Sequence, residues 1–422
     1  MWDVISQRAL LIREPNEVRI LRLVRDSGQI SRIEISRTCN LNKAYVTDLV
    51  TKLIKAGFLE ETGKVLSSGK VGRKRILLKF RPTAGLVAGV DIGMTRATVA
   101  LTDLNAKILQ QETFEYSLEA SASEVLSRVA ATITSLLTAS NYPQSMLVGI
   151  GVGVQGVIDY TTNTLVVSHN KRAWQGESLS ADLEATFNVP VYVENDVKTM
   201  TIGEYLLGAA KGTKTSVYIW VGDGLGAGMM INGQLHRGIT SSAGEIGYNG
   251  LEASSYYREK FPLMYTGQAM FGEILTDSNI AQSYQRNAGV SSGEPISVAS
   301  IVSRANRGDT VAQRVIDECT SLLSILSIII VNTLNPEMIL IGGKLAQHCQ
   351  ELAGMLHDKI HKDLLPVPAD AAKVRSARHG EAGVVLGAVG LVLYEMFEPL
   401  HSLSLRPTRR HKVGKLRTVD VG

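Results

Sequence analysis

The stretch YIWVGDGLGAGMMINGQ (Tyr218–Gln234) places a run of alternating glycines between two apolar segments. Such a pattern predicts a strand, a tight loop and a second strand, and loops of this kind commonly bind phosphate through backbone N–H groups. Asp223 stands inside the loop, where its charge would repel a phosphate by roughly 4 kcal/mol at about 4 Å and an effective dielectric of about 20. The stretch keeps the fold of a phosphate loop but places an anion in it.

Several other apolar segments end in the same way. The segments 86–109, 146–159, 189–197 and 335–346 each read as a buried strand that runs into Gly, Asp or Asn. In α/β folds the ligand-binding groups lie at the carboxyl ends of strands. One glycine-rich loop would be weak evidence, but several in order predict an α/β protein with a ligand site at the strand ends.

Length and composition fit a protein of two or three domains. The chain has 422 residues, 45% of them hydrophobic, and three cysteines without a C-x-x-C spacing. Neither a disulfide framework nor a cysteine-rich zinc site is indicated, so we expect a reducing, cytoplasmic location. No signal peptide is recognisable, and the longest apolar run, Leu322–Val331, is about half of a bilayer span. We therefore expect a buried helix there and no membrane partner.

Positive charge gathers at the two ends of the chain. Residues 1–80 carry 16 Lys and Arg against 8 Asp and Glu, and residues 406–422 carry 6 against 1. The middle of the chain is acidic, because the net charge of the whole is only +4. This segregation predicts a polyanionic partner for the N-terminal segment.

The N-terminal segment predicts three helices. The first runs from Asn16 to Gly28, the second begins at a capping box formed by Ser31 and Glu34, and the third carries an apolar stripe that ends near Gly57. The opposite face of the third helix is small and polar, as expected of a helix that approaches base edges. We predict that this face binds DNA through Asn42, Lys43, Thr47 and Asp48.

A basic hairpin follows these helices. The residues FLEETGKVLSSGKVGRKRILLKF (Phe58–Phe80) read as two strands joined by a basic loop. Together with the helices they predict a winged helix-turn-helix whose wing brings Lys70, Arg73 and Lys74 to the phosphate backbone or a minor groove of duplex DNA. The alternative, a helical cap that only packs on the rest of the chain, would not need the positive surplus.

The ordered motifs resemble those of the ROK family of repressors and sugar kinases. DIGMTR (Asp91–Arg96) is similar to the family's first phosphate loop, GDGLGAG (Gly222–Gly228) to the second, and ILIGGKLA (Ile339–Ala346) to the adenosine-side segment. The resemblance implies an actin-like, two-lobed sugar-kinase fold. With the winged domain at residues 1–80, we expect lobes at 81–195 and 196–380, a helix near 381–400 that completes the first lobe, and a basic tail at 401–422.

The phosphate loops depart from the family's kinases. Those kinases usually have glycine, lysine and threonine where this chain has Met94, Arg96 and Asp223. Met94 places a side chain where backbone should approach phosphate, and Asp223 replaces a hydroxyl donor by an acceptor. We therefore predict degenerate loops and no nucleotide cofactor. A magnesium ion held by Asp223 and Asp91 is the alternative. The degenerate loop residues are Asp91, Gly93, Met94, Gly222, Asp223 and Gly224.

The sugar-site motifs of the family are better preserved. VENDV (Val193–Val197) and AGEIGYN (Ala243–Asn249) resemble two of them. The resemblance implies hydroxyl contacts from a set of amides and carboxylates, which suit a polyol because they accept or bridge hydroxyl groups. The set is Asn170, Asn195, Asp196 and Glu245, with Glu273 matched across a replaced loop.

The family's zinc motif is missing. Where zinc-containing members have a histidine and a cysteine cluster, this chain has Tyr248 and a segment without Cys or His. Zinc requires about four nitrogen or sulfur ligands. We therefore predict no metal site, and the loss of the histidine leaves the identity of the sugar open.

These observations predict a sugar-responsive transcriptional regulator without enzymatic activity. The resemblance implies a repressor of carbohydrate-utilisation genes whose partners are duplex operator DNA and a sugar or sugar derivative. Regulators of this type usually present two DNA-binding domains to a pseudo-palindromic site, so we predict a homodimer or homotetramer. Two alternatives stay open: an active sugar kinase with an added DNA-binding domain, and a constitutive DNA-binding protein with a vestigial sugar site.

Overall fold

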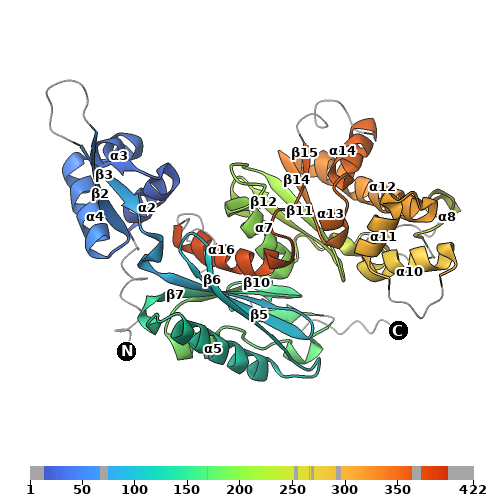
Figure 1. The fold of residues 1–422 in the computed structure, drawn as a ribbon, viewed down its shortest axis with the longest axis horizontal. Coiled ribbons are helices and arrows are strands. Elements are labelled where there is room, and N and C mark those ends of the chain that lie inside the picture. Colours follow the sequence, from blue (N-terminus) through green and yellow to red (C-terminus); the bar gives the residue numbers. More distant parts are fainter. Residues whose placement is uncertain are drawn as a thin grey trace.

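The computed structural model describes residues 14–66, 75–168, 170–250, 255–265, 267, 270–290, 296–363 and 372–397. Three larger sheets organise these residues, one in the N-terminal part and one in each of two lobes (Figure 1). The predicted wing residues Lys70, Arg73 and Lys74, and the basic tail, lie outside the described residues.

The N-terminal part is a winged helix-turn-helix. Ser31 and Glu34 form the predicted capping box, in which the backbone N–H of Ser31 donates to Oε2 of Glu34 at 2.9 Å. The apolar stripes of the helices bury Leu21, Val46 and Leu49 in one core. The two wing strands pair antiparallel, as predicted. The elements are α2 (Pro15–Ser27), β1 (Ile30–Ser31), α3 (Arg32–Cys39), α4 (Lys43–Lys55), β2 (Leu59–Leu66) and β3 (Arg75–Phe80).

The first lobe is built on a five-stranded sheet in the order β10-β7-β4-β5-β6. Its three parallel strands, β4, β7 and β10, end at the same edge of the sheet, which is the edge predicted to hold ligand groups. The strands are β4 (Leu86–Ile92), β5 (Arg96–Asp103), β6 (Ile108–Glu115), β7 (Leu147–Val154) and β10 (Val191–Asn195). With them lie α5 (Ala122–Ala139), α6 (Ala181–Phe187) and a hairpin of β8 (Val157–Asp159) and β9 (Thr164–Val167).

The second lobe has a sheet in the order β13-β12-β11-β14-β15. Asn232 and Gly233, both with positive φ, make the tight turn between β12 and β13. The strands are β11 (Ser216–Val221), β12 (Leu225–Ile231), β13 (Gln234–Leu235), β14 (Met338–Gly342) and β15 (Lys373–Ser376). The helices are α7 (Asp196–Leu206), α8 (Ser255–Lys260), α9 (Phe271–Ile274), α10 (Asp277–Ala288), α11 (Val298–Asn306), α12 (Thr310–Leu334), α13 (Lys344–His348) and α14 (Leu352–Asp363).

Helix α12 contains the longest apolar run. It is long and apolar enough to cross a membrane, but 67% of its most apolar stretch is buried inside the protein. Its buried residues include Leu322, Leu326 and Val331, which pack in the core of the second lobe. This is the burial expected of a core helix, and a single such helix is weak evidence for a membrane span.

Two helices, α7 and α16 (Gly383–Phe397), pack against each other between the two sheets (Figure 1). Glycines bring their backbones close: a Cβ on Gly203 would lie 3.0 Å from the Cα of Gly387. Glycine also admits α16 to the first sheet, since a Cβ on Gly151 would lie 1.9 Å from the carbonyl oxygen of Ala388. Short 3-10 helices lie at η1 (Pro82–Ala84), η2 (Gln144–Met146), η3 (Arg172–Trp174), η4 (Ile246–Tyr248) and η5 (Gly380–Ala382).

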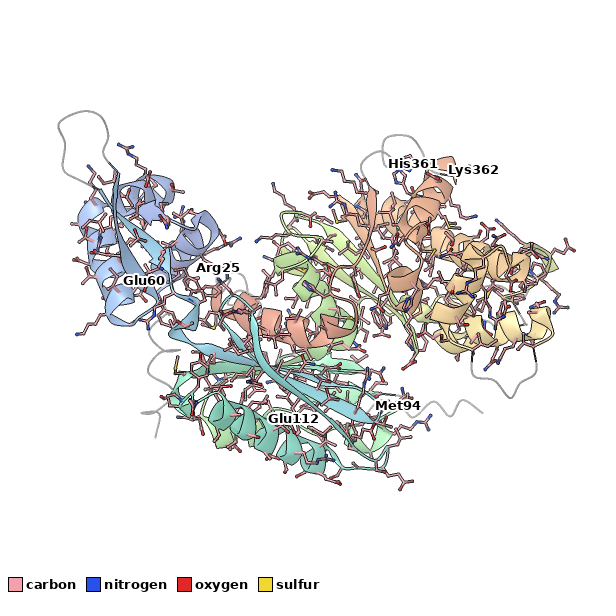
Figure 2. All side chains as sticks on the ribbon, in the orientation of Figure 1. Arg25, Glu60, Met94, Glu112, His361 and Lys362 are labelled. Atoms are coloured by element: carbon pink, nitrogen blue, oxygen red, sulfur yellow. The ribbon has the colours of Figure 1, made fainter. Side chains whose placement is uncertain are left out.

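The far end of α16 packs on the winged domain. The ring of Phe397 meets that of Phe80 edge to face at 6.1 Å, and the guanidinium of Arg25 lies 4.6 Å from the Phe397 ring centre. Figure 2 labels Arg25 at this junction. One helix therefore contacts α7, the first sheet and the winged domain.

Candidate functional site

Three carboxylates gather where the two lobes meet. Asp91 lies near the end of β4, Asp196 begins α7 directly after β10, and Glu245 precedes η4 in the second lobe. Burial, and to a lesser degree the charge of Asp196, raise the pKa of Asp91 to about 7. Burial likewise raises the pKa of Asp196 to about 6, with the charge of Glu245 adding to the effect. The charge of Asp196 thus opposes the ionisation of Asp91, and the charge of Glu245 opposes that of Asp196.

Asn195 and Asp196 have different roles in this arrangement. The side-chain oxygen of Asn195 accepts from the backbone N–H of Lys198 and caps α7, while its amide donates to the carbonyl of Gly156 at 3.1 Å and to Oδ1 of Asp196 at 3.0 Å. Oδ1 of Asp196 also accepts from the N–H of Val197 at 2.8 Å. The hydrogen bonds from Asn195 and Val197 both go to Oδ1, so Oδ2 of Asp196 is the oxygen that we expect a ligand to reach.

Two cations hold the loop that carries Glu245. Nε of Arg237 donates to Oε2 of the buried Glu194 at 2.6 Å, which joins this second-lobe loop to the end of β10 in the first lobe. Nζ of Lys198, on α7, donates to the carbonyl of Ser241 at 2.7 Å. The position of Glu245 is therefore tied to the same strand and helix that present Asp196.

Asn170 and Glu273 are less closely engaged. Asn170 is exposed, and its amide donates to Oε1 of Gln155 at 3.3 Å. Glu273 is also exposed, and its Oε2 accepts from the backbone N–H of Met270 at the start of α9. Its neighbour Gly272 lies against Gly247 of η4, since a Cβ on Gly272 would be 3.1 Å from the Gly247 carbonyl oxygen. Glu273 thus lies near the Glu245 loop but acts as a helix cap.

The backbone carbonyls of the first phosphate loop accept hydrogen bonds from residues that the sequence analysis did not single out. The hydroxyl of Tyr116 donates to the carbonyl of Gly93 at 2.5 Å. Lys171 donates to that hydroxyl at 2.6 Å and to the carbonyl of Met94 at 3.4 Å, while its ammonium lies 4.2 Å from the ring centre of Trp174. Burial lowers the pKa of Lys171 to about 8. Met94 lies at the end of the first sheet away from the winged domain (Figure 2).

The second phosphate loop closes on itself. The N–H of Gly222 donates to the carbonyl of Gly224 at 3.0 Å, and the carbonyl of Gly222 accepts from the N–H of Asp277 at 2.8 Å. Asp277 pairs with Lys344 at 3.1 Å, where Lys344 directly follows Gly343 of the adenosine-side motif. Asp223 is exposed in the loop and adds to the effect of burial in raising the pKa of Asp277. An anion that approached the second phosphate loop would therefore meet the carboxylates of Asp223 and Asp277.

The described part of the chain contains no group of three or more His, Cys, Asp and Glu residues arranged to hold a metal ion. The three carboxylates at the lobe boundary are included in that statement. Residues 251–254, 266 and 268–269 of the segment that replaces the family's zinc motif lie outside the described residues.

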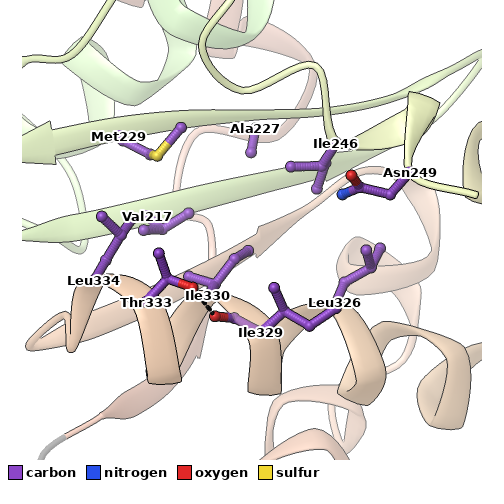
Figure 3. A pocket seen from close by; sticks show the side chains of 10 residues that line it. All are labelled: Val217, Ala227, Met229, Ile246, Asn249, Leu326, Ile329, Ile330, Thr333 and Leu334. Carbon is purple, nitrogen blue, oxygen red and sulfur yellow. Dashed lines mark hydrogen bonds between the residues drawn. The ribbon is translucent and has the colours of Figure 1, made fainter. Parts of the chain in front are cut away.

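A separate apolar cavity of about 190 Å³ lies between α12 and the face of the second sheet opposite α7. Figure 3 shows its lining, in which aliphatic side chains predominate and the hydroxyl of Thr333 is used internally, donating to the carbonyl of Ile329 at 2.7 Å. Such a lining offers few partners to a polyol. The cavity is therefore distinct from the carboxylate site, although Ile246 in its wall directly follows Glu245.

The predicted recognition helix is α4, with Lys43, Thr47 and Asp48 exposed on one face. The hydroxyl of Thr47 donates to the carbonyl of Lys43 at 2.8 Å. Asn42 caps the helix, its Oδ1 accepting from the N–H of Ala44 at 2.8 Å. The face that α4 presents to solvent is therefore the polar one.

The family of the chain follows from comparison with known proteins. Residues 87–395 match the ROK family, and residues 14–63 match the MarR family. The chain belongs to the ROK family. The ROK match includes Asp91, Asp196 and Glu245, and the MarR match includes α4.

Several relatives of this ROK protein are named as regulators. It is 27% identical over 396 residues to a "Putative xylose repressor" of a Caldicellulosiruptor species, covering 92% of this chain and 97% of the relative. It is 28% identical over 383 residues to "DNA-binding transcriptional repressor Mlc" of Escherichia coli, covering 89% and 92%.

Solved structures show the same fold. A ROK family transcriptional regulator, described as a homologue of the Escherichia coli Mlc protein, superposes with a TM-score of 0.76 at 23% identity over 90% of this chain and 96% of that one. A putative sugar kinase from Cytophaga hutchinsonii covers 73% of this chain with a TM-score of 0.61 at 19% identity. The ROK fold with an added winged helix-turn-helix, expected from the sequence, is confirmed.

Proposed function

We propose that this ROK protein is a sugar-responsive, DNA-binding transcriptional regulator of the repressor type, acting in the cytoplasm. The observation that carries the proposal is the coexistence in one chain of a winged helix-turn-helix and a half-buried carboxylate set at the lobe boundary. The names of the relatives, which include a xylose repressor and Mlc, support it.

The carboxylate set suits a polyol. Oδ2 of Asp196 and the carboxylate of Glu245 can accept from sugar hydroxyls, and Asp91, with a pKa near 7, can accept or donate at neutral pH. Asn195 holds Asp196 in place through its amide, so its role is positioning as well as contact. We place Asn170 and Glu273 at the edge of the site.

An active sugar kinase is the second candidate, favoured by the carboxylate set, because Asp196 with its raised pKa has the character of a general base. Against it stand the side chain of Met94 and the charge of Asp223 in the two phosphate loops. A nucleotide with several negative charges would also meet Asp277 beside Asp223. We therefore propose that the protein does not transfer phosphate.

Helices α7 and α16 offer a route from the sugar to the DNA-reading heads. Asp196 begins α7, α7 packs against α16 through Gly203 and Gly387, and the end of α16 packs on the winged domain through Phe397. A ligand that favours one arrangement of the lobes would shift α7 relative to α16, and this shift would reorient the winged domain. Differential affinity of about 1 to 3 kcal/mol is typical of such coupling.

We also propose that the protein acts as at least a dimer, because two reading heads must match half-sites about one helical turn of DNA apart. The function is tested by measuring DNA affinity in the presence and absence of a sugar panel. The proposal requires at least one sugar to change the affinity for operator DNA. If no sugar in the panel changes it, the alternative of a constitutive DNA-binding protein with a vestigial sugar site would be favoured.

A further inference from the structure

Trp220 stands beside the sugar site in a position that the family resemblance does not explain. Alternate residues of β11 face opposite sides: Val217, Ile219 and Val221 pack toward α12, while Tyr218 and Trp220 lie on the α7 side. Trp220 is half-buried, whereas the other residues of β11 are buried. An aromatic side chain on the inner face of the strand is thus accessible near the lobe boundary.

The indole is close to the proposed sugar contacts. Trp220 pairs with Gly226 across the β11–β12 ladder, and a Cβ on Gly226 would lie 3.2 Å from Cγ2 of Val197. Val197 directly follows Asp196. Trp220 is therefore one strand away from the helix start that presents the Asp196 carboxylate.

The indole also contacts the glycines of two loops, Gly222 and Gly342. A Cβ on Gly222 would lie 2.6 Å from Nε1 of Trp220, and a Cβ on Gly342 would lie 3.0 Å from its Cε3 atom. The side chain thus bridges the second phosphate loop and the adenosine-side loop. Among the described residues, no hydrogen-bond acceptor is found for the indole N–H, and it is not buried. The indole is half-buried, so part of its surface and its hydrogen-bond donor are exposed beside the two loops that the resemblance assigns to a nucleotide.

The charged groups around the indole carry a net negative charge. Asp223 is exposed in the loop after β11, and Asp277 donates its backbone N–H to Gly222. Lys344 neutralises one of these two carboxylates through its ion pair with Oδ2 of Asp277, while Oδ1 of Asp277 is buried without a hydrogen-bond partner. This surrounding suits hydroxyl donors and opposes phosphate groups.

We propose that Trp220 is the floor of a second saccharide subsite, so that the preferred effector has at least two sugar rings. One face of a sugar ring presents C–H groups that pack on an aromatic face, and its rim presents hydroxyls that can reach the indole N–H and Asp223. The inference rests on the proposed function, since the first ring occupies the site formed by Asp196 and Glu245. The second ring would then lie where the family's kinases bind the nucleotide.

The test compares monosaccharides with their disaccharides on the full chain by titration calorimetry. The probes are xylose with xylobiose and glucose with cellobiose, and the variants are Trp220→Ala, Trp220→Phe and Asp196→Ala. We expect one disaccharide to bind at least about tenfold more tightly than its monosaccharide. Trp220→Ala should abolish this preference but keep the monosaccharide affinity, and Trp220→Phe should retain most of the preference.

Intrinsic fluorescence gives a second readout, because the chain has only three tryptophans. The disaccharide should change the emission of the parent protein more than the monosaccharide does, and Trp220→Phe should lose that difference. Thermal unfolding of each variant checks that it is folded.

The outcomes separate this inference from the proposed function. The second subsite would be overturned if the parent bound the monosaccharide and the disaccharide with equal affinity, or if Trp220→Ala kept the preference for the disaccharide. The proposed function would still stand in that case if sugar binding depended on Asp196. Tight binding of ATP to the parent, lost in Trp220→Ala, would overturn it in favour of a retained nucleotide site. Absence of binding by every saccharide would count against both.

Discussion

Arg237, in a loop of the second lobe, donates a 2.6 Å hydrogen bond to Glu194 at the end of a strand of the first lobe. The side chain of Glu194 is 1% exposed and that of Arg237 is 17% exposed. The remaining oxygen of Glu194 accepts from the N–H of Asn195 at 2.9 Å. The pair therefore joins the two lobes and at the same time supports the residue that caps α7.

Glu194→Gln should destabilise the protein by about 3 kcal/mol, because removing one partner of a buried ion pair leaves the other charge uncompensated. The midpoint of denaturant unfolding measures the effect. Glu60→Gln is the matched control, since Glu60 forms an ion pair with Lys79 whose two side chains are exposed, and its loss should cost less than about 1 kcal/mol. Equal effects of the two substitutions would show that the Arg237–Glu194 pair contributes no more to the free energy of unfolding than an exposed ion pair does.

The stability of the protein should fall between pH 5 and pH 8. The pKa of Asp91 is raised to about 7 in the folded state, so the folded protein holds a proton that the unfolded chain releases near pH 4. The stabilisation is complete below pH 4 and is lost as the pH rises through about 7. The apparent Tm measured across this range should decrease accordingly.

Asp91→Asn should flatten this pH dependence and raise the apparent Tm at pH 8 by about 3 to 8 °C relative to the parent. The substitution removes one titrating group and also the like charge that faces Asp196. The control is Asp358→Asn, which neutralises an exposed carboxylate on α14 and should leave the profile unchanged. A parent profile that rises from pH 5 to pH 8 would contradict the account.

The protein should neither bind Mg-ATP tightly nor phosphorylate sugars. Calorimetry with Mg-ATP should give no micromolar binding, because the side chain of Met94 and the charge of Asp223 oppose a nucleotide in the two phosphate loops. A coupled assay over the sugar panel should stay at background. Any phosphorylated sugar above background would make the kinase candidate the leading one.

DNA binding should depend on the winged helix-turn-helix. Lys43→Ala on the exposed start of α4 and Arg73→Ala in the predicted wing should each weaken binding to operator DNA. For each phosphate contact that is lost, the slope of log affinity against log salt should decrease by about 0.9. Lys211→Ala, an exposed lysine in the body of the protein, is the control. Deletion of residues 1–80 without loss of affinity would refute the assignment.

Local patterns made much of the fold predictable from the sequence. The capping box of Ser31 and Glu34 uses residues three apart, and the turn at Asn232 and Gly233 needs only the positive φ that these residue types adopt readily. The glycine loops could also be placed, because each follows an apolar strand.

The contacts that complete the site could not be predicted, because they join distant parts of the chain. Lys171 reaches Tyr116 and Met94, 55 and 77 residues away, and Arg237 reaches Glu194 across 43 residues. The sequence grouped Asp91 with the phosphate loops, whereas the structure places it beside Asp196. Asn195 was expected to contact sugar, and the structure gives its amide and carbonyl to capping and to positioning Asp196.

The central claim is that a saccharide bound at the lobe boundary controls DNA affinity through α7 and α16. The most direct measurement is operator affinity, with and without the best saccharide, in the parent and in Asp196→Ala, Glu245→Ala and Phe397→Ala. The parent should respond by about 5- to 150-fold, the two carboxylate variants should lose saccharide binding and the response together, and Phe397→Ala should bind the saccharide but respond less. Carboxylate variants that bind the saccharide and respond as the parent does would contradict the account.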